Sequence, residues 1–276
     1  MAFTRKILSD EKYIDRACEV EKRAMNKGPY LRNAWNYYKN GDGALVGIFD
    51  GDLLVGIGRL SVMPDKIGWL ECLRVHPDYQ RKGCGKLIYE KWLEVAKEYD
   101  CRGLAMFTST DNRASSGLRE RYGLFTTSEN IVYRTKDFKA GYRGSFRQVN
   151  WERAVELIVP KFDEYGGYMT TNRTFYRINA ENAKYFADMG FVFEDEANGD
   201  FVVLGSRFRH SSGLNILMMG GNADNCIRFC KSMARLTGVS DLTCTVTAQN
   251  ERLKNILLEN GFSVSSPVFI TKERIF

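Results

Sequence analysis

The fold is decided by the stretch Gln80-Arg81-Lys82-Gly83-Cys84-Gly85-Lys86. It follows an apolar segment, Ile67–Val75, that predicts a β-strand, and it opens an amphipathic helical pattern that continues to Tyr99. Two glycines separated by one residue let the backbone turn tightly and approach a ligand closely. The free N–H groups and the positive dipole end of a helix favour phosphate, and three cations stand in the same stretch. We therefore expect an anion-binding loop between a strand and a helix.

Outward from this loop, strand and helix patterns alternate in a way that predicts an α/β protein with a mixed sheet. The first half reads as a strand, two helices, three strands, a helix, a strand, a helix and a final strand. The expected strands are Phe3–Ile7, Ala44–Phe49, Leu53–Val62, Ile67–Val75, Leu104–Thr108 and Ile131–Arg134, and the expected helices include Leu31–Tyr38 and Asn112–Tyr122.

The chain repeats itself at half its length. Asn112 and Gly123 recur 138 residues later as Asn250 and Gly261, and Leu104 recurs as Leu242. Ungapped matches across a helix, a strand and a second helix indicate two copies of one fold. We expect domains over residues 1–138 and 145–276, joined by a polar, glycine-containing linker over Lys136–Phe146.

The loop and the strand before it resemble the GCN5-related N-acetyltransferase (GNAT) family. The family signature Q/R-x-x-G-x-G/A is matched by Gln80–Gly85, and Leu73-Arg74-Val75-His76-Pro77 before it is also typical. The resemblance implies two tandem acyl-CoA N-acyltransferase folds, each a mixed, mostly antiparallel sheet flanked by helices. It implies acetyl-CoA as cosubstrate and no metal. The residues it implies for binding acetyl-CoA are Leu73, Arg74, Val75, Gln80, Arg81, Lys82, Gly83, Cys84, Gly85, Lys86 and Asn112.

The resemblance also implies a reaction, in which a primary amine attacks the thioester directly in a ternary complex. The amine must first lose a proton, and Glu71 is the candidate base. Strand alternation places Glu71, Leu73 and Val75 on one face and Cys72 on the other. The alternative is that Glu71 is only a polar residue near a sheet edge.

The sequence differs from the family pattern at the residue expected to protonate the leaving thiolate. The family often has a tyrosine seven residues after the asparagine, but Arg119 stands there. Arg119 can stabilise a thiolate by charge without donating a proton. Tyr122 lies one helical turn further and is the second candidate. Asn112 either bonds the pantetheine arm or caps its helix.

The second copy has lost the cations of the loop. At the same offset the stretch becomes Met218-Met219-Gly220-Gly221-Asn222-Ala223-Asp224. Asp224 replaces Lys86, and an acid at a helix start repels phosphate. We expect residues 145–276 to keep the fold without catalysing a reaction.

Composition narrows the class of protein. The net charge is +6, from 40 basic and 34 acidic residues, without a dense basic block, so nucleic acid is a weaker alternative than an anionic cofactor. Seven cysteines without a C-x-x-C pair predict reduced core thiols in a cytoplasmic protein rather than a metal site. We expect no signal peptide and no membrane span. A non-catalytic acyl-CoA sensor is the alternative to the enzyme. The acceptor is a small-molecule or a protein amine, and no oligomeric state is predicted.

Overall fold

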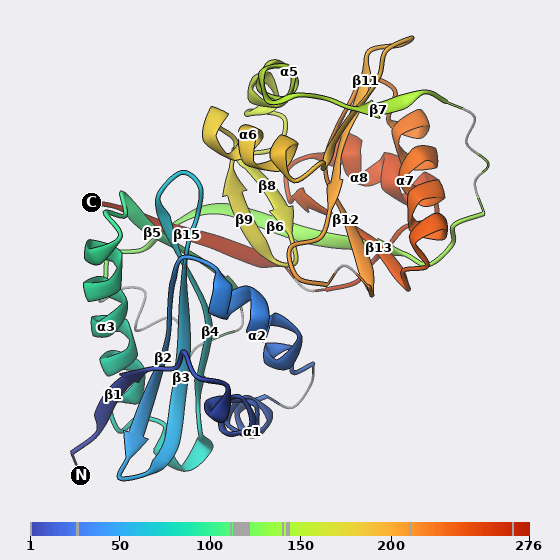
Figure 1. The fold of residues 1–276 in the computed structure, drawn as a ribbon. Coiled ribbons are helices and arrows are strands. Elements are labelled where there is room, and N and C mark those ends of the chain that lie inside the picture. The colour runs from blue at the N-terminus through green and yellow to red at the C-terminus, as the bar shows by residue number, and fades with distance from the viewer. Residues whose placement is uncertain are drawn as a thin grey trace. The chain divides into compact units, whose positions relative to one another are not determined.

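The computed structural model describes residues 2–25, 28–110, 112, 122–139, 141, 144–209, 211–266 and 268–276 (Figure 1). The chain forms two compact units. Unit 1 comprises Met1–Phe107, Asp111–Phe125 and Lys272–Phe276, and unit 2 comprises Thr108–Thr110 and Thr126–Thr271.

Unit 1 is a mixed sheet in which the neighbouring strands β1, β2, β3 and β4 are antiparallel and β4 and β5 are parallel. The end of β15 follows β5 in the strand order. The strands are β1 (Thr4–Ile7), β2 (Gly43–Asp50), β3 (Leu53–Val62), β4 (Ile67–Val75), β5 (Gly103–Ser109) and β15 (Phe269–Ile275). The helices are α1 (Ile14–Ala24), α2 (Leu31–Asn40) and α3 (Cys84–Glu98), with short 3-10 turns η1 (Glu11–Tyr13) and η2 (Pro77–Tyr79).

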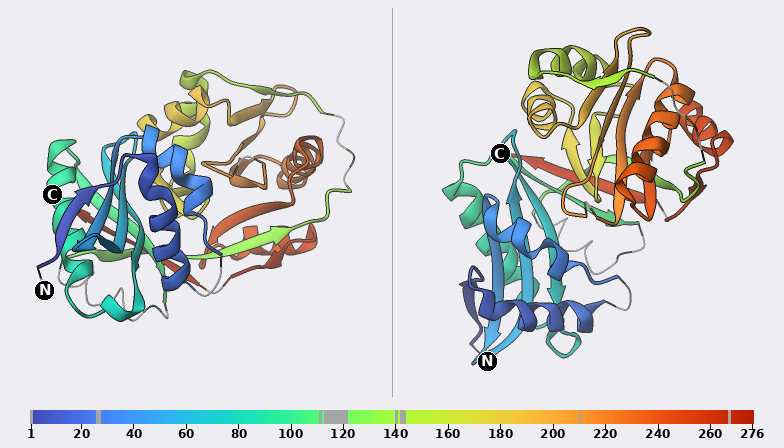
Figure 2. Two further views of the ribbon diagram at one scale, coloured as in Figure 1. Left: turned by 60° about the horizontal axis from the view of Figure 1, so that its bottom comes forward. Right: turned by 45° about the vertical axis from the view of Figure 1, so that its right-hand side comes forward.

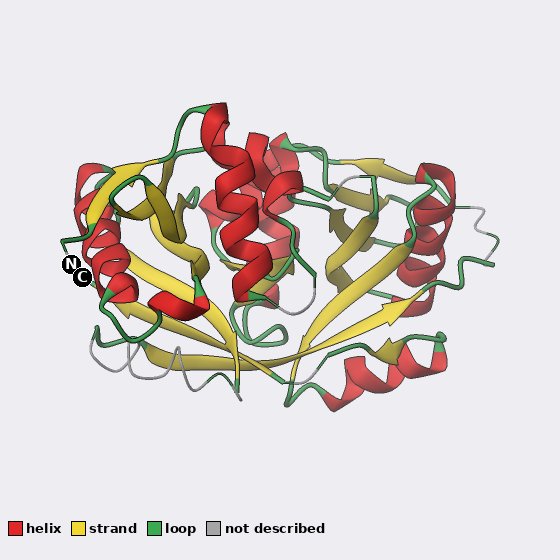
Figure 3. Ribbon diagram, turned by 90° about the horizontal axis from the view of Figure 1, so that it is seen from below, coloured by secondary structure: helices red, strands yellow, loops and turns green. Residues whose placement is uncertain are grey.

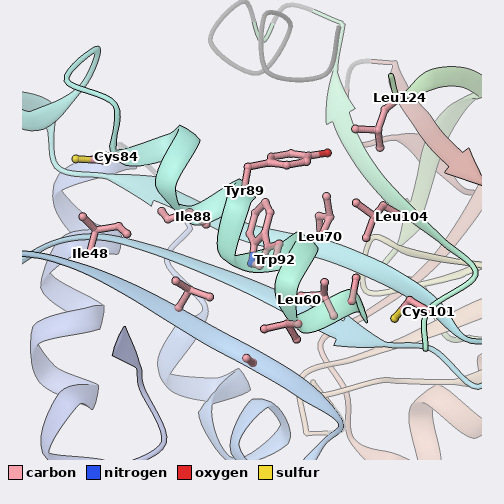
Figure 4. Close-up of a cluster of buried hydrophobic side chains, with 14 of the residues drawn as sticks. Ile48, Leu60, Leu70, Cys84, Ile88, Tyr89, Trp92, Cys101, Leu104 and Leu124 are labelled. Carbon is pink, nitrogen blue, oxygen red and sulfur yellow. The ribbon is translucent and has the colours of Figure 1, made fainter. Parts of the chain in front are cut away.

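Helix α3 covers one face of this sheet, and α1 and α2 cover the other (Figures 1 and 2). On the α3 side, Ile88 and Trp92 pack with Leu60 and Leu70 in a buried cluster (Figure 4). Gly58 of β3 lets the helix come close, because a Cβ there would lie 2.6 Å from the Trp92 ring. This packing fixes where α3 lies on the sheet.

Unit 2 repeats the plan with the strand order β6-β13-β12-β11-β10-β7, and β14 also pairs with β6. Its strands are β6 (Phe125–Thr135), β7 (Phe146–Gln148), β10 (Val192–Asp195), β11 (Asp200–Gly205), β12 (Gly213–Gly220), β13 (Asp241–Thr247) and β14 (Ser263–Val264), and β8 (Tyr168–Thr171) and β9 (Thr174–Arg177) form a separate hairpin. Its helices are α5 (Trp151–Ile158), α6 (Ala180–Asp188), α7 (Ala223–Thr237) and α8 (Glu251–Glu259), with a 3-10 turn η3 (Val159–Lys161) (Figure 3). No helix in the described ranges has the length and apolar character to cross a membrane.

The predicted fold class and the predicted repeat are confirmed. Strands β5 and β13 have seven residues each and begin 138 positions apart, and helices α3 and α7 have fifteen residues each. In both units the helix joins two parallel strands. Helix α7 begins 139 positions after α3, one more than the offset of the strands. The earlier elements do not align without gaps, because unit 2 inserts the β8–β9 hairpin between its first two helices.

The two units differ from the expected sequence halves at two strands, β6 and β15. The strand expected over Ile131–Arg134 is longer, Phe125–Thr135, and its second half pairs with β13 of unit 2, with Tyr133 opposite Cys244. Residues Lys272–Phe276 belong to unit 1, where the N–H of Phe276 donates to the carbonyl of Arg102 at 3.0 Å. A local pattern predicts that a strand forms, but long-range pairing selects its partner.

Candidate active site

Strands β4 and β5 separate part of the way along their length. Their parallel pairing covers only Ile67–Trp69 of β4, opposite Gly103–Ala105. The other edge of β4 stays paired with β3 as far as Val75. Within the described strand pairs, the β5-facing edge of β4 beyond Trp69 therefore has no ladder partner, and its backbone groups are available to an extended ligand.

A β-bulge lies at the point where the strands separate. Arg59 pairs with Glu71 and Ile57 pairs with Arg74, so two residues of β4, Cys72 and Leu73, lie opposite the single residue between them on β3. Cys72 has a left-handed backbone with φ of 56°. A bulge of this kind adds one residue to a strand and changes the direction of the side chains that follow.

The bulge makes the predicted alternation of side chains wrong. Glu71 is hydrogen-bonded to Tyr38 of α2, and Cys72 to Tyr30 just before α2, so both lie on the α1 and α2 face. Leu73 and Val75 instead pack on the cluster beneath α3. The extra residue shifts the alternation by one position, and this places Glu71 and Cys72 together.

The backbone of Leu73 and Val75 nevertheless points toward the separation. The N–H of His76 donates to Val55 on β3 at 2.8 Å, so the carbonyl of the same trans peptide, that of Val75, points to the opposite edge. Gln80 Nε2 donates to that carbonyl at 3.3 Å. Alternation along the backbone directs Leu73 to the same edge. Leu73 and Val75 are among the residues that the resemblance implies for binding acetyl-CoA.

The loop after β4 leads into helix α3, whose N-terminus has no side-chain cap. Arg81 and Gly83 have φ of 61° and 93°, and Gly83 is the N-cap of α3. No side chain caps this helix, and a Cβ built on Gly83 would meet nothing within 4 Å. The first-turn N–H groups and the helix dipole therefore have room for an anion at this position.

The cations of the loop surround this helix start. Lys82 Nζ lies 5.2 Å from the Tyr79 ring, and Lys86 Nζ lies 3.5 Å from Glu90 one turn along α3. Arg81 is exposed. Cys84 is buried in the cluster under α3, so it contributes its backbone rather than its thiol to the loop, whereas Gly85 lies in the first turn of the helix.

The other predicted site residues lie outside the glycine loop. Arg74 Nη1 donates to the carbonyl of Leu73 at 2.9 Å, so its guanidinium stays beside the bulge. Tyr122 stacks on Tyr89 of α3 with ring centroids 3.9 Å apart. Asn112 is exposed. Arg119 and most of the helix expected over Asn112–Tyr122 lie outside the described residues.

Glu71 has neighbours that sequence patterns did not identify as part of the site. Its two carboxylate oxygens accept hydrogen bonds from Tyr38 at 2.8 Å and from Ser61 at 2.7 Å. Arg59, opposite Glu71 in the ladder, is 2% exposed. One signal was present in the sequence, because Arg59 is the single charge within the otherwise apolar strand Leu53–Val62.

The thiols of the site are neutral. Burial raises the pKa of Cys72 to about 12 and also raises the pKa of Cys84. A thiol is a nucleophile only as the thiolate, so neither is poised to take an acyl group. Among the described residues, no three His, Cys, Asp or Glu side chains gather in a way that could hold a metal ion.

Unit 2 shows the same separation and the same kind of bulge. Strand β12 pairs with β13 only over Gly213–Ile216, and a register shift leaves Leu217 without an opposite residue on β11. Here, however, the helix start is closed. The Asn222 side chain caps α7, and the N–H of Asn222 donates to Asp200 at 2.7 Å. A carboxylate of the protein thus occupies the anion position of this unit.

The strand edge of unit 2 is filled as well. The Tyr165 hydroxyl donates to the carbonyl of Met219 and accepts from its N–H. The space left beside Tyr165, Met219 and the first turn of α7 is a cavity of about 40 Å³.

Comparisons with known proteins agree with this geometry. The sequence model of the Acetyltransferase (GNAT) family matches residues 6–124. An uncharacterized N-acetyltransferase of Escherichia coli K12, YedL, is 36% identical over 63 residues, which are 23% of this chain and 40% of that relative.

Two solved structures match almost the whole chain. A tandem GNAT protein from the clavulanic acid biosynthesis pathway has a TM-score of 0.65 at 11% identity, covering 99% of this chain and 98% of that one. A GCN5-related N-acetyltransferase from Sphaerobacter thermophilus has a TM-score of 0.61 at 13% identity, covering 99% and 95%. At these identities the likeness establishes the fold alone. Residues 6–124 of this chain therefore form a domain of the Acetyltransferase (GNAT) family.

Proposed function

We propose that unit 1 is an acetyl-CoA-dependent N-acetyltransferase that moves the acetyl group to a primary amine. The observation that carries this proposal is the edge of β4 that has no strand partner beyond Trp69 among the described strand pairs, followed along the chain by a helix α3 whose start no side chain caps. A pantetheine arm fits the strand edge at Leu73 and Val75, and a pyrophosphate fits the N–H groups from Gly83 onward. Arg81, Lys82 and Lys86 supply the positive charge around it.

The amine attacks the thioester directly in the ternary complex. The neutral thiols of Cys72 and Cys84 support this route, because an acetyl-cysteine intermediate needs a thiolate. Backbone N–H groups near the bulge polarise the acetyl carbonyl as its charge develops. Glu71, next to the bulge, removes the proton from the ammonium form of the acceptor, directly or through one water.

The thiolate of CoA leaves on the side of α3. Tyr122 is our candidate to protonate it, because its ring is anchored on Tyr89 at the edge of the α3 cluster. Arg119 would add positive charge, and Asn112 would bond the pantetheine arm. We assign these roles from the family pattern.

Unit 2 keeps the fold without turnover, and we propose that it binds no CoA. Both parts of its groove are occupied by side chains of the protein itself. Tyr165 hydrogen-bonds the strand edge at Met219, and Asp200 accepts from the N–H of Asn222 at the start of α7. One chain therefore binds one acetyl-CoA. The seven free cysteines suit a reducing compartment, and we place the enzyme in the cytoplasm.

Thiol release from acetyl-CoA, measured with a panel of amines, tests the activity. The panel contains α-amino acids, amino sugars, diamines and lysine-containing peptides, so it covers both small-molecule and protein acceptors. We expect release that depends on one class of amine and acetylated amine in equal amount by mass spectrometry. Tight binding of acetyl-CoA without release for every amine would instead support a non-catalytic acyl-CoA sensor.

A further inference from the structure

The carboxylate of Glu71 is held at both oxygens by neutral hydroxyl donors. Tyr38 of α2 donates to Oε2 at 2.8 Å, and Ser61 of β3 donates to Oε1 at 2.7 Å. Glu71 is 9% exposed. A buried charge needs such partners, and two donors from two elements leave the carboxylate a single orientation.

A buried guanidinium acts on both donors. Arg59 Nε donates to Ser61 Oγ at 3.1 Å, so Ser61 accepts from a cation and donates to an anion. The Arg59 guanidinium also lies over the Tyr38 ring, 5.4 Å from its centre. Hydrogen bonds in such a chain strengthen one another, and a cation over a phenol ring makes its hydroxyl a better donor.

Arg59 is itself locked in place. Its Nη2 donates to the carbonyls of Gly41 and Asp42, just after α2, at 3.0 and 2.7 Å. These contacts tie the end of α2 to the middle of β3. The distance from Tyr38 to Glu71 is therefore set by the same side chain that supplies the charge.

The remaining groups around Glu71 do not replace this role. Tyr30 is hydrogen-bonded to Tyr38, and burial raises the pKa of both Tyr30 and Cys72, so both stay neutral. Charges that act on Tyr30 and Cys72 include Arg74 of β4, beside the bulge, and Glu21 of α1, whose Oε2 accepts from the N–H groups of Tyr30 and Leu31.

We propose that Tyr38, Ser61 and Arg59 are positioning residues that keep Glu71 ionised and fixed in direction as the base of the reaction. The inference rests on the proposed role of Glu71. Each hydroxyl donates to one carboxylate oxygen and fixes its direction, and the ionised carboxylate receives the proton of the acceptor amine. Without the donors, the same carboxylate would be protonated at higher pH and free to rotate.

The test measures the protonation of Glu71 itself. Glutamate labelled with carbon-13 at Cδ is titrated by NMR in the full chain, and Glu71→Gln identifies the resonance. Hydrogen bonds to a carboxylate favour its charged form, so we expect Tyr38→Phe and Ser61→Ala each to raise the Glu71 pKa by about one unit. Tyr37→Phe, which removes a hydroxyl from the adjacent position of α2, is the matched control and leaves it unchanged.

The same variants are then followed in the pH dependence of kcat/KM, with acetyl-CoA and the best amine of the panel. The apparent pKa of the acid limb rises by the same amount as the pKa of Glu71 measured by NMR, because this limb reports the base of the free enzyme. Ser61→Thr keeps a hydroxyl and restores the wild-type limb. Bound CoA, measured by calorimetry, shows that each variant is folded.

The outcomes separate this inference from the proposed function. An NMR pKa of Glu71 that is unchanged in both Tyr38→Phe and Ser61→Ala overturns the positioning role, even if Glu71→Gln removes the acid limb. An NMR pKa that moves while the limb stays in place removes Glu71 as the base and thereby overturns the inference with it. If Ser61→Ala does not fold, Tyr38→Phe, which keeps the ring and its contact with Arg59, decides alone.

Discussion

The Tyr165 hydroxyl hydrogen-bonds both backbone groups of Met219, accepting from its N–H at 2.8 Å and donating to its carbonyl at 3.0 Å. An amide of pantetheine also has one hydrogen-bond donor and one acceptor with which to bind a strand edge. Burial raises the Tyr165 pKa well above 10, so the hydroxyl keeps its proton. Unit 2 thus satisfies with its own side chain the edge that unit 1 leaves open.

Removing this hydroxyl should loosen unit 2. Tyr165→Phe leaves two buried backbone groups of Met219 unpaired, which costs about 1–3 kcal/mol. We expect faster hydrogen exchange at the Met219 amide and a lower melting temperature. Tyr168→Phe, which removes a hydroxyl that donates to Thr127 near the surface, is the control. Equal effects of the two changes would show that Tyr165 does not hold the strand edge.

Charge at the start of α3 should decide CoA binding. Gly85→Asp places a carboxylate in the first turn, as Asp224 does in α7, and repels the pyrophosphate while suiting the helix dipole. We expect the wild type to bind one CoA per chain by calorimetry and Gly85→Asp to bind none. Gly85→Asn, of the same shape without the charge, retains part of the affinity. Two equal sites per wild-type chain would contradict the closed groove of unit 2.

The base should affect the rate far more than cofactor binding. Glu71→Gln keeps the size of the side chain and removes its proton-accepting charge, so we expect turnover to fall by about 10²–10⁴-fold. Because Glu71 lies on the α1 and α2 face, CoA affinity should stay within error of the wild type. A variant with an unchanged pH–rate profile would remove Glu71 from the mechanism.

The last five residues should be needed by unit 1. Phe276 pairs with Arg102 next to β5, and Arg274 Nη1 donates to the Tyr122 carbonyl at 3.0 Å. Deleting Lys272–Phe276 should lower the melting temperature and weaken CoA binding. Arg274→Ala tests the Tyr122 contact separately. A shortened chain with wild-type CoA affinity would show that β5 is stable without this strand.

Acid should weaken unit 2 through Asp195. Burial pushes the pKa of this carboxyl up, but hydrogen bonds from Ser145, the Ala197 N–H, Asn225 and Asn198 outweigh it, and the pKa lies below 3.8. A lowered pKa stabilises the fold above the unfolded pKa, and that stability is lost as pH falls through the folded value. Below about pH 4, the urea midpoint should therefore fall less steeply in Asp195→Asn than in the wild type. Parallel pH curves would exclude Asp195 as the acid-sensitive group.

The sequence alone was enough for the elements and the repeat. The strand Ile67–Val75, the glycine loop and the helix after it follow from apolar periodicity and glycine placement, which are local properties of the chain. The structure begins α3 at Cys84, two residues before the predicted Lys86, because Gly83 acts as its cap. The sequence also predicted a non-catalytic second copy, from the change from Lys86 to Asp224, and this stays a prediction.

Tertiary structure alone decided the hydrogen-bond partners of Glu71, the face on which Leu73 and Val75 lie, and the unit to which strands β6 and β15 belong. One extra residue at Cys72 turned Leu73 and Val75 to the opposite face from Glu71, and no alternation rule locates such a residue in advance. The contacts of Glu71 with Tyr38, of Tyr165 with Met219 and of Phe276 with Arg102 join residues far apart in the chain. Such contacts depend on which faces and edges meet once the sheets have formed, and this is settled by packing rather than by local sequence.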